Sequence, residues 1–110
     1  MDVLLVLPNA DMYLERLPSL GLMNLYMIGR ELGCRMELAD LTAESYSDGL
    51  RRILSKPYDV IGISCNFTSS AAYCMQYGRD VKKARPSAVL VGGGNNATFV
   101  PEDLLCSGFD

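Results

Sequence analysis

The stretch VIGISCNFTSSAAYCMQYGRDVKKARPSAVLVGGG, residues 60–94, holds two short apolar runs on either side of a segment with helical periodicity. The runs Val60–Ser64 and Ala88–Val91 are almost continuously apolar, which is typical of strands buried on both faces of a sheet. Strand, helix and strand at these lengths predict a βαβ unit with parallel strands. The intervening residues that share one helix face are Ala71, Cys74, Met75, Gly78 and Val81.

The same alternation begins earlier in the chain. Val3–Leu7 and Met36–Ala39 predict two further strands, and the second alternates polar and apolar residues as an edge strand does. Helical patterns follow both, the first stopped by Gly33 and the second by Pro57, and a short helix is expected to open at Pro101. The helical positions are Leu22, Leu25, Tyr26, Gly29 and Leu32 in the first pattern, and Tyr46, Leu50, Ile53 and Leu54 in the second.

These elements predict an α/β fold of three layers, with a parallel sheet between helices in the flavodoxin-like strand order 2-1-3-4. That fold has a fifth strand beside the fourth, and Ser107–Asp110 is typical of a lead-in to it. We therefore expect residues 1–110 to form a single domain whose fifth strand is cut off at the C-terminus.

Composition narrows the possible functions. A net charge of −3 provides no basic surface for nucleic acid, and no apolar run approaches the roughly 20 residues that cross a bilayer. The start of the chain lacks a signal-peptide pattern, so we expect a cytoplasmic protein without nucleic-acid or membrane partners.

Histidine is absent, so this segment offers neither His-based acid–base catalysis nor a His-ligated metal. We expect no catalytic or metal-binding residue in it. The four cysteines match no zinc-site spacing and are expected to be buried small hydrophobes; they are Cys34, Cys65, Cys74 and Cys106.

Ligands of such sheets bind beyond the carboxyl ends of the strands, where three loops are expected. The loop Pro8–Ser19 exceeds the usual length of about two to six residues, so it either covers a ligand or is a surface loop that starts a helix at Pro18-Ser19. It has no glycine-rich phosphate-binding pattern.

The other two loops are polar and glycine-rich. Ser64, Asn66 and Thr68 offer groups that hydrogen-bond a ligand, whereas Ser69 or Ser70 is expected to cap the next helix. Gly92-Gly93-Gly94 leaves the backbone bare, which favours a flat or bulky ligand, although a single glycine would satisfy a turn with positive φ.

Taken in order, these motifs resemble the N-terminal cobalamin-binding domain of radical SAM proteins. Such proteins include cobalamin-dependent methyltransferases and the anaerobic magnesium-protoporphyrin monomethyl ester cyclase. The resemblance covers essentially the whole chain. The segments that carry it are Pro18-Ser19-Leu20-Gly21-Leu22, Ala39-Asp40-Leu41, Tyr58-Asp59-Val60-Ile61-Gly62-Ile63-Ser64, Lys82-x-x-x-Pro86 and Val91-Gly92-Gly93.

The resemblance implies a slot in the sheet for the nucleotide tail of cobalamin. Ser64 and Thr68 would hydrogen-bond the dimethylbenzimidazole and its linker, while the glycines let the tail lie along the backbone. The cofactor-binding candidates are Pro8, Asn9, Ser64, Cys65, Asn66, Thr68, Gly92, Gly93, Gly94, Asn95 and Asn96.

Two departures from the wider cobalamin pattern matter. The Asp-x-His-x-x-Gly motif that supplies a lower cobalt ligand is missing, because no histidine follows Asp11, and Asn96 stands where many relatives have histidine. The resemblance therefore implies base-off cobalamin. The resemblance also implies a C-terminal radical SAM domain that would bind S-adenosylmethionine and a [4Fe-4S] cluster and would perform radical methyl transfer or oxidative cyclisation. The iron–sulfur motif of such a domain, Cys-x-x-x-Cys-x-x-Cys, is absent from this segment.

Two other functions share the fold but fit the loop residues less well. The first is a degenerate domain that would keep the fold as an interaction platform without cofactor. Separately, if the fifth strand is cut off, the uncovered edge of the fourth strand would weaken cofactor binding and allow edge-to-edge homodimers. A receiver or flavin module is a poor fit, since Ser64 replaces the receiver aspartate and Pro8–Asp11 replaces the hydroxyl-rich phosphate loop.

Overall fold

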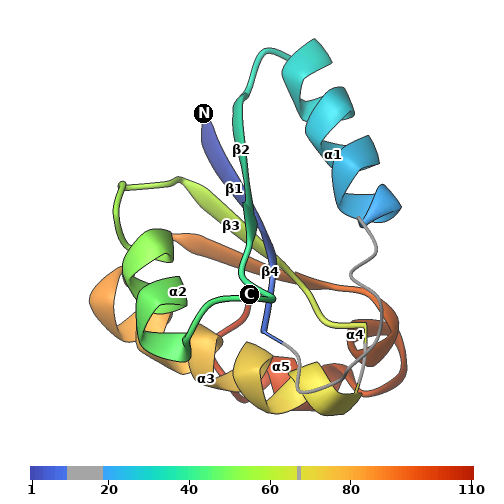
Figure 1. The fold of residues 1–110 in the computed structure, drawn as a ribbon, viewed down its shortest axis with the longest axis vertical. Coiled ribbons are helices and arrows are strands. Elements are labelled where there is room, and N and C mark those ends of the chain that lie inside the picture. The colour runs from blue at the N-terminus through green and yellow to red at the C-terminus, as the bar shows by residue number, and fades with distance from the viewer. Residues whose placement is uncertain (10–18, 67) are drawn as a thin grey trace.

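Four parallel strands form the centre of the molecule (Figure 1). The computed structural model describes residues 1–9, 19–66 and 68–110. The strands pair in the order β2-β1-β3-β4, which confirms the predicted topology. Their bounds are β1 Asp2–Leu7, β2 Arg35–Asp40, β3 Val60–Ser64 and β4 Val89–Gly93.

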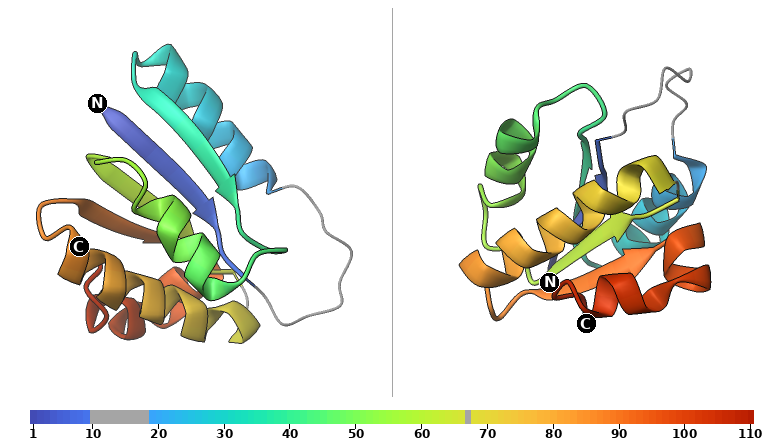
Figure 2. Two further views of the ribbon diagram at one scale, coloured as in Figure 1. Left: turned by 60° about the vertical axis from the view of Figure 1, so that its left-hand side comes forward. Right: turned by 90° about the horizontal axis from the view of Figure 1, so that it is seen from below.

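Helices cover both faces of this sheet (Figure 2). Helix α1 lies on one face, over β1 and β2, whereas α2 and α3 lie on the other. Helix α5 packs against α3, and its Leu104 lies against Gly92 of β4. The helices are α1 Leu20–Glu31, α2 Tyr46–Ile53, α3 Thr68–Ala84, α4 Asn95–Phe99 and α5 Pro101–Leu105.

Local chemistry explains where several helices begin and end. The Ser19 hydroxyl accepts from the Leu22 amide at 3.3 Å, and the Ser45 hydroxyl accepts from the Asp48 amide at 3.2 Å. Gly33, at φ +86°, follows the end of α1, as its stop signal predicts. The sequence did not predict α4, which was treated as part of the glycine loop.

The two faces of the sheet are buried to different extents. The larger core joins the sheet to α2 and α3, with Ile53, Tyr77 and Val81 fully buried. The smaller core beneath α1 has three buried members, Val3, Leu5 and Leu22. The α1 face is therefore the less completely covered side of the sheet.

The chain returns to the outer edge of β4 at Asp110. The Asp110 amide donates to the Leu90 carbonyl at 2.8 Å, and its carboxylate accepts from the Leu90 amide at 2.9 Å and from the Lys82 ammonium at 2.7 Å. This places Asp110 where a neighbouring strand would pair with β4. The described residues hold four strands, so the fifth strand stays a prediction.

Candidate cofactor-binding site

The site is built on the sheet face that carries α1. Strand side chains alternate between faces, and Val3 and Leu5 of β1 point toward α1. The pairing of Val3 with Val60, and of Val60 with Val89, places every second residue of β3 and β4 on this same face. The face therefore presents Gly62 and Ser64 from β3, and Val89, Val91 and Gly93 from β4.

Helix α1 leaves the β3 and β4 part of this face uncovered. Val89 and Val91 are 45% and 48% exposed, and Gly93 is exposed as well. The sequence predicts that β3 and β4 are buried on both faces, but in the structure the face that carries α1 is exposed at β4 and only partly covered at β3. We call the area formed by Gly62, Val89, Val91 and Gly93 the open sheet face.

One flank of α1 faces away from β2. Met23 and Met27 lie beside β2, and helical spacing puts Leu25 and Ile28 on the opposite flank. Leu25 is 55% exposed and Ile28 is 52% exposed. Leu25 and Ile28 together with the open sheet face make up an exposed apolar surface with bare backbone at Gly93, and we call this surface the trough.

Ser64 lies at the carboxyl end of the trough. It is buried, and its hydroxyl accepts from the Asn66 side-chain amide at 2.8 Å. The Cys65 amide donates to the Gly93 carbonyl at 2.7 Å, and the Cys65 carbonyl accepts from the Asn96 amide at 2.9 Å. These bonds hold the exits of β3 and β4 together.

The three adjacent glycines have different surroundings. A Cβ on Gly93 would meet no atom within 4 Å, so this position is open to a ligand. A Cβ on Gly92 would lie 2.6 Å from Leu104 in the opposite core, and one on Gly94, at φ +93°, would collide with Asn66. Gly93 is therefore the glycine whose missing side chain keeps the trough open.

Other predicted residues lie around this centre without facing it. The Cys65 side chain is fully buried on the α3 side, so only its backbone is placed near a ligand. Pro8 and Asn9 are buried at the exit of β1, and Asn9 bonds to protein groups on both ends of its amide. Asn95 and Asn96 begin α4 at the mouth of the trough. The Thr68 side chain and Asp11 lie outside the described residues.

The cysteines contribute no ligand set. A hydrogen bond with Cys65, together with burial, raises the pKa of the Cys74 thiol, so the thiol stays protonated. Cys65 and Cys74 are buried as expected and Cys34 partly so, but Cys106 is exposed, which corrects the expectation for that residue. The described part of the chain contains no group of three or more possible metal ligands, and none of its helices is suited in length and hydropathy to span a bilayer.

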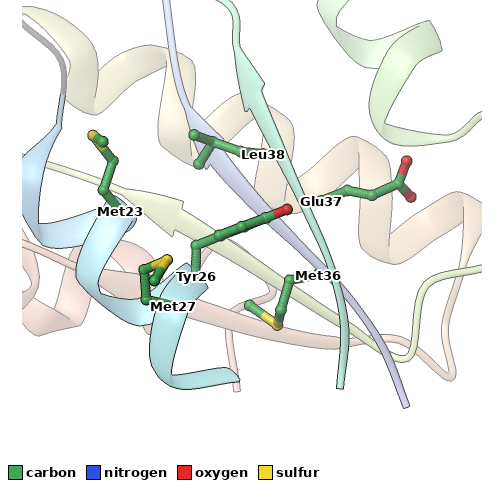
Figure 3. Close-up of a pocket in the computed structure, with 6 residues that line it drawn as sticks. All are labelled: Met23, Tyr26, Met27, Met36, Glu37 and Leu38. Carbon is green, nitrogen blue, oxygen red and sulfur yellow. The ribbon is translucent and has the colours of Figure 1, made fainter. Parts of the chain in front are cut away.

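A second apolar hollow lies on the β2 side of α1 (Figure 3). Its volume is about 560 Å³. Figure 3 shows Met36 and Leu38 directed toward α1, while Glu37 points away to the other face. Sequence reasoning missed this hollow, although Met23 and Met27 at i, i+4 spacing were a signal of it. Its lining residues are Met23, Tyr26, Met27, Met36, Glu37 and Leu38.

The trough combines exposed apolar groups with a polar end. Gly93 exposes backbone, Val91 and Leu25 supply apolar contact, and Ser64 supplies a hydroxyl at the mouth. The fold is that of a doubly wound α/β domain, a class whose ligands bind at the carboxyl edge of the sheet.

Comparison with known proteins gives the family. The family described as B12 binding domain matches residues 10–110. The chain is 32% identical over 111 residues to hopanoid C-3 methylase of Methylococcus capsulatus, a match that covers 98% of this chain and 22% of that protein. The chain belongs to the B12-binding domain family, which confirms cobalamin as its cofactor.

Proposed function

We propose that this domain holds cobalamin base-off and presents it to a radical SAM domain, for methyl transfer or oxidative cyclisation. The observation that carries the proposal is the open sheet face, an exposed apolar surface with open space at Gly93 and with Ser64 paired beside it at the end of β3. The chain spans 22% of the length of the relative, which is a methylase. The proposed acceptor domain would supply the binding sites for S-adenosylmethionine and a [4Fe-4S] cluster.

The residues of the trough would hold the nucleotide tail. Gly93 and Val91 offer a smooth surface to the dimethylbenzimidazole, and Leu25 and Ile28 offer apolar side chains. The Ser64 hydroxyl, with Thr68 from the sequence pattern, would hydrogen-bond the linker. Cobalamin supplies the reactive cobalt when bound, and these side chains orient it.

A tail held in the trough would be detached from the cobalt. The chain has no histidine, so no imidazole from these residues replaces the detached base. The lower face of the corrin would then carry water, a weak ligand or none. This is the physical basis for proposing the base-off form.

We propose that a fifth parallel strand completes the sheet beside β4. The hydrogen bonds between Asp110 and Leu90 support this, because they have the direction of a neighbouring strand. Where that edge is uncovered, edge-to-edge homodimers and weaker cofactor binding follow. The four free cysteines support a reducing, cytoplasmic location.

Electron paramagnetic resonance tests the base-off proposal. In free cob(II)alamin the nitrogen of dimethylbenzimidazole adds a superhyperfine splitting to the cobalt lines. We expect this splitting to disappear when the protein is added, because the base leaves the cobalt and no protein imidazole replaces it. A nitrogen splitting that persists in the bound state would contradict the base-off form.

A further inference from the structure

We propose that Tyr77 is a positioning residue for cobalamin binding: through Asn9, its hydroxyl fixes the point where the chain leaves β1 at the ligand edge. The inference rests on the proposed binding of cobalamin at that edge. It concerns a residue on the opposite side of the sheet from the trough, which no motif singles out.

The Asn9 side chain is held at both ends. Its carbonyl oxygen accepts from the Tyr77 hydroxyl at 2.5 Å, and its nitrogen donates to the Glu44 backbone carbonyl at 2.5 Å. Asn9 is 5% exposed and Tyr77 is fully buried. A buried hydrogen bond to α3 and a partly buried one to the loop after β2 therefore hold the exit of β1 in place.

Packing holds the Tyr77 hydroxyl in one position. Its ring stacks on Tyr46 with ring centroids 4.5 Å apart, and Gly49 of α2 leaves the space that the hydroxyl occupies, since a Cβ there would collide with it. Burial raises the pKa of Tyr77 to about 12, so the hydroxyl remains a donor at physiological pH. The hydroxyl that donates to Asn9 is thus held in position and stays neutral.

Asn9 lies at the same edge of the sheet as the polar end of the trough. The last pair of β1 with β3 is Val6 with Ile63, so Pro8 and Asn9 follow the end of β1 at the edge where Cys65 and Asn66 follow the end of β3. Asn66 donates in turn to the Ser64 hydroxyl. Loss of the Tyr77 hydroxyl leaves the Asn9 oxygen buried without this donor, and we expect the exit of β1 to shift against the site.

Tyr77→Phe removes the hydroxyl and keeps the ring, and Tyr46→Phe is its matched control. Tyr46 donates to Asp80 on α3, so it loses a comparable bond without a link to β1. Hydroxocobalamin titration followed by absorbance should show an affinity about fivefold to tenfold weaker for Tyr77→Phe. For Tyr46→Phe the affinity should stay within about twofold of wild type at similar unfolding stability in urea.

Asn9→Ala tests the same path from its other end. Asn9→Ala should weaken binding as Tyr77→Phe does, and the double variant should be no weaker than either single variant. Equal affinities for Tyr77→Phe and Tyr46→Phe, or additive losses in the double variant of Asn9 and Tyr77, would overturn the inference about Tyr77. Either result would leave the proposed function standing. Failure of the wild type to take up hydroxocobalamin would overturn the proposed function, and this inference with it.

Discussion

Gly92, Gly93 and Gly94 are adjacent in the sequence and serve three purposes at the end of β4. Gly92 makes room for Leu104, Gly93 opens the trough, and Gly94 adopts φ +93° at the turn into α4. The sequence pattern predicted that a ligand lies against this bare backbone, and that ligand stays a prediction. It did not distinguish the three positions, because their neighbours come from α5 and from the exit of β3.

Gly94→Ala should destabilise the protein. With φ +93° and ψ −174° the residue occupies a region that side chains rarely adopt, and the new Cβ would collide with Asn66. We expect a loss of about 1–3 kcal/mol in the free energy of unfolding, measured in urea. Gly93→Ala is the matched control and should be close to neutral, because its Cβ meets open space. Equal stability of the two variants would contradict this assignment.

At the same scale, side-chain direction decided which predicted residues face the site. Strand alternation puts Ser64 and Cys65 on opposite faces, so the orientation of Cys65 was accessible from the sequence. The partners of Asn9 were not accessible, since Glu44 and Tyr77 lie 35 and 68 residues away along the chain. Contacts of that separation depend on how α2 and α3 pack.

At the scale of elements, strong periodicity made most strands and helices predictable. The predicted strand 88–91 runs to Gly93, because the β3 partner continues to pair through Ser64. Helix α4 was missed since its five residues are too few for a helical pattern and follow a turn set by Gly94. Helix α1 is apolar on both flanks, which suits its place between the trough and the hollow beside β2.

The end of the chain beside β4 should respond to pH. The Lys82 ammonium and the Leu90 amide lower the pKa of Asp110 below its ordinary value of 3.8. A lowered pKa means that the ionised carboxylate stabilises the fold fully above pH 3.8, and that this stability is lost as the pH falls through the folded-state pKa. The effect is small because the group is exposed.

Asp110→Asn is the variant that isolates this effect. Urea unfolding should show wild type more stable than the variant near neutral pH, and the difference should shrink at about pH 3. A difference that is constant across this range would show that the charge of Asp110 does not act on the fold.

At the scale of the whole molecule, the strand order could be predicted from the sequence, whereas the parts of the sheet that helices cover could not. Alternating strands and helices with right-handed crossovers leave few arrangements, and the order 2-1-3-4 followed from them. The bare α1 face of β3 and β4 did not follow, because apolar strands predict burial without saying what buries them. That uncovered apolar face is where we place the cofactor tail.

The most direct test of this account is cobalamin retention by a protein whose trough is filled. Gly93→Trp places a bulky side chain on the open floor, and Ser87→Trp adds the same bulk at the opposite, exposed end of the β4 region. After incubation with hydroxocobalamin and gel filtration, wild type and Ser87→Trp should elute with the corrin absorption bands, and Gly93→Trp should elute without them while remaining folded by circular dichroism. Equal retention by folded Gly93→Trp and wild type would contradict a cofactor site in the trough.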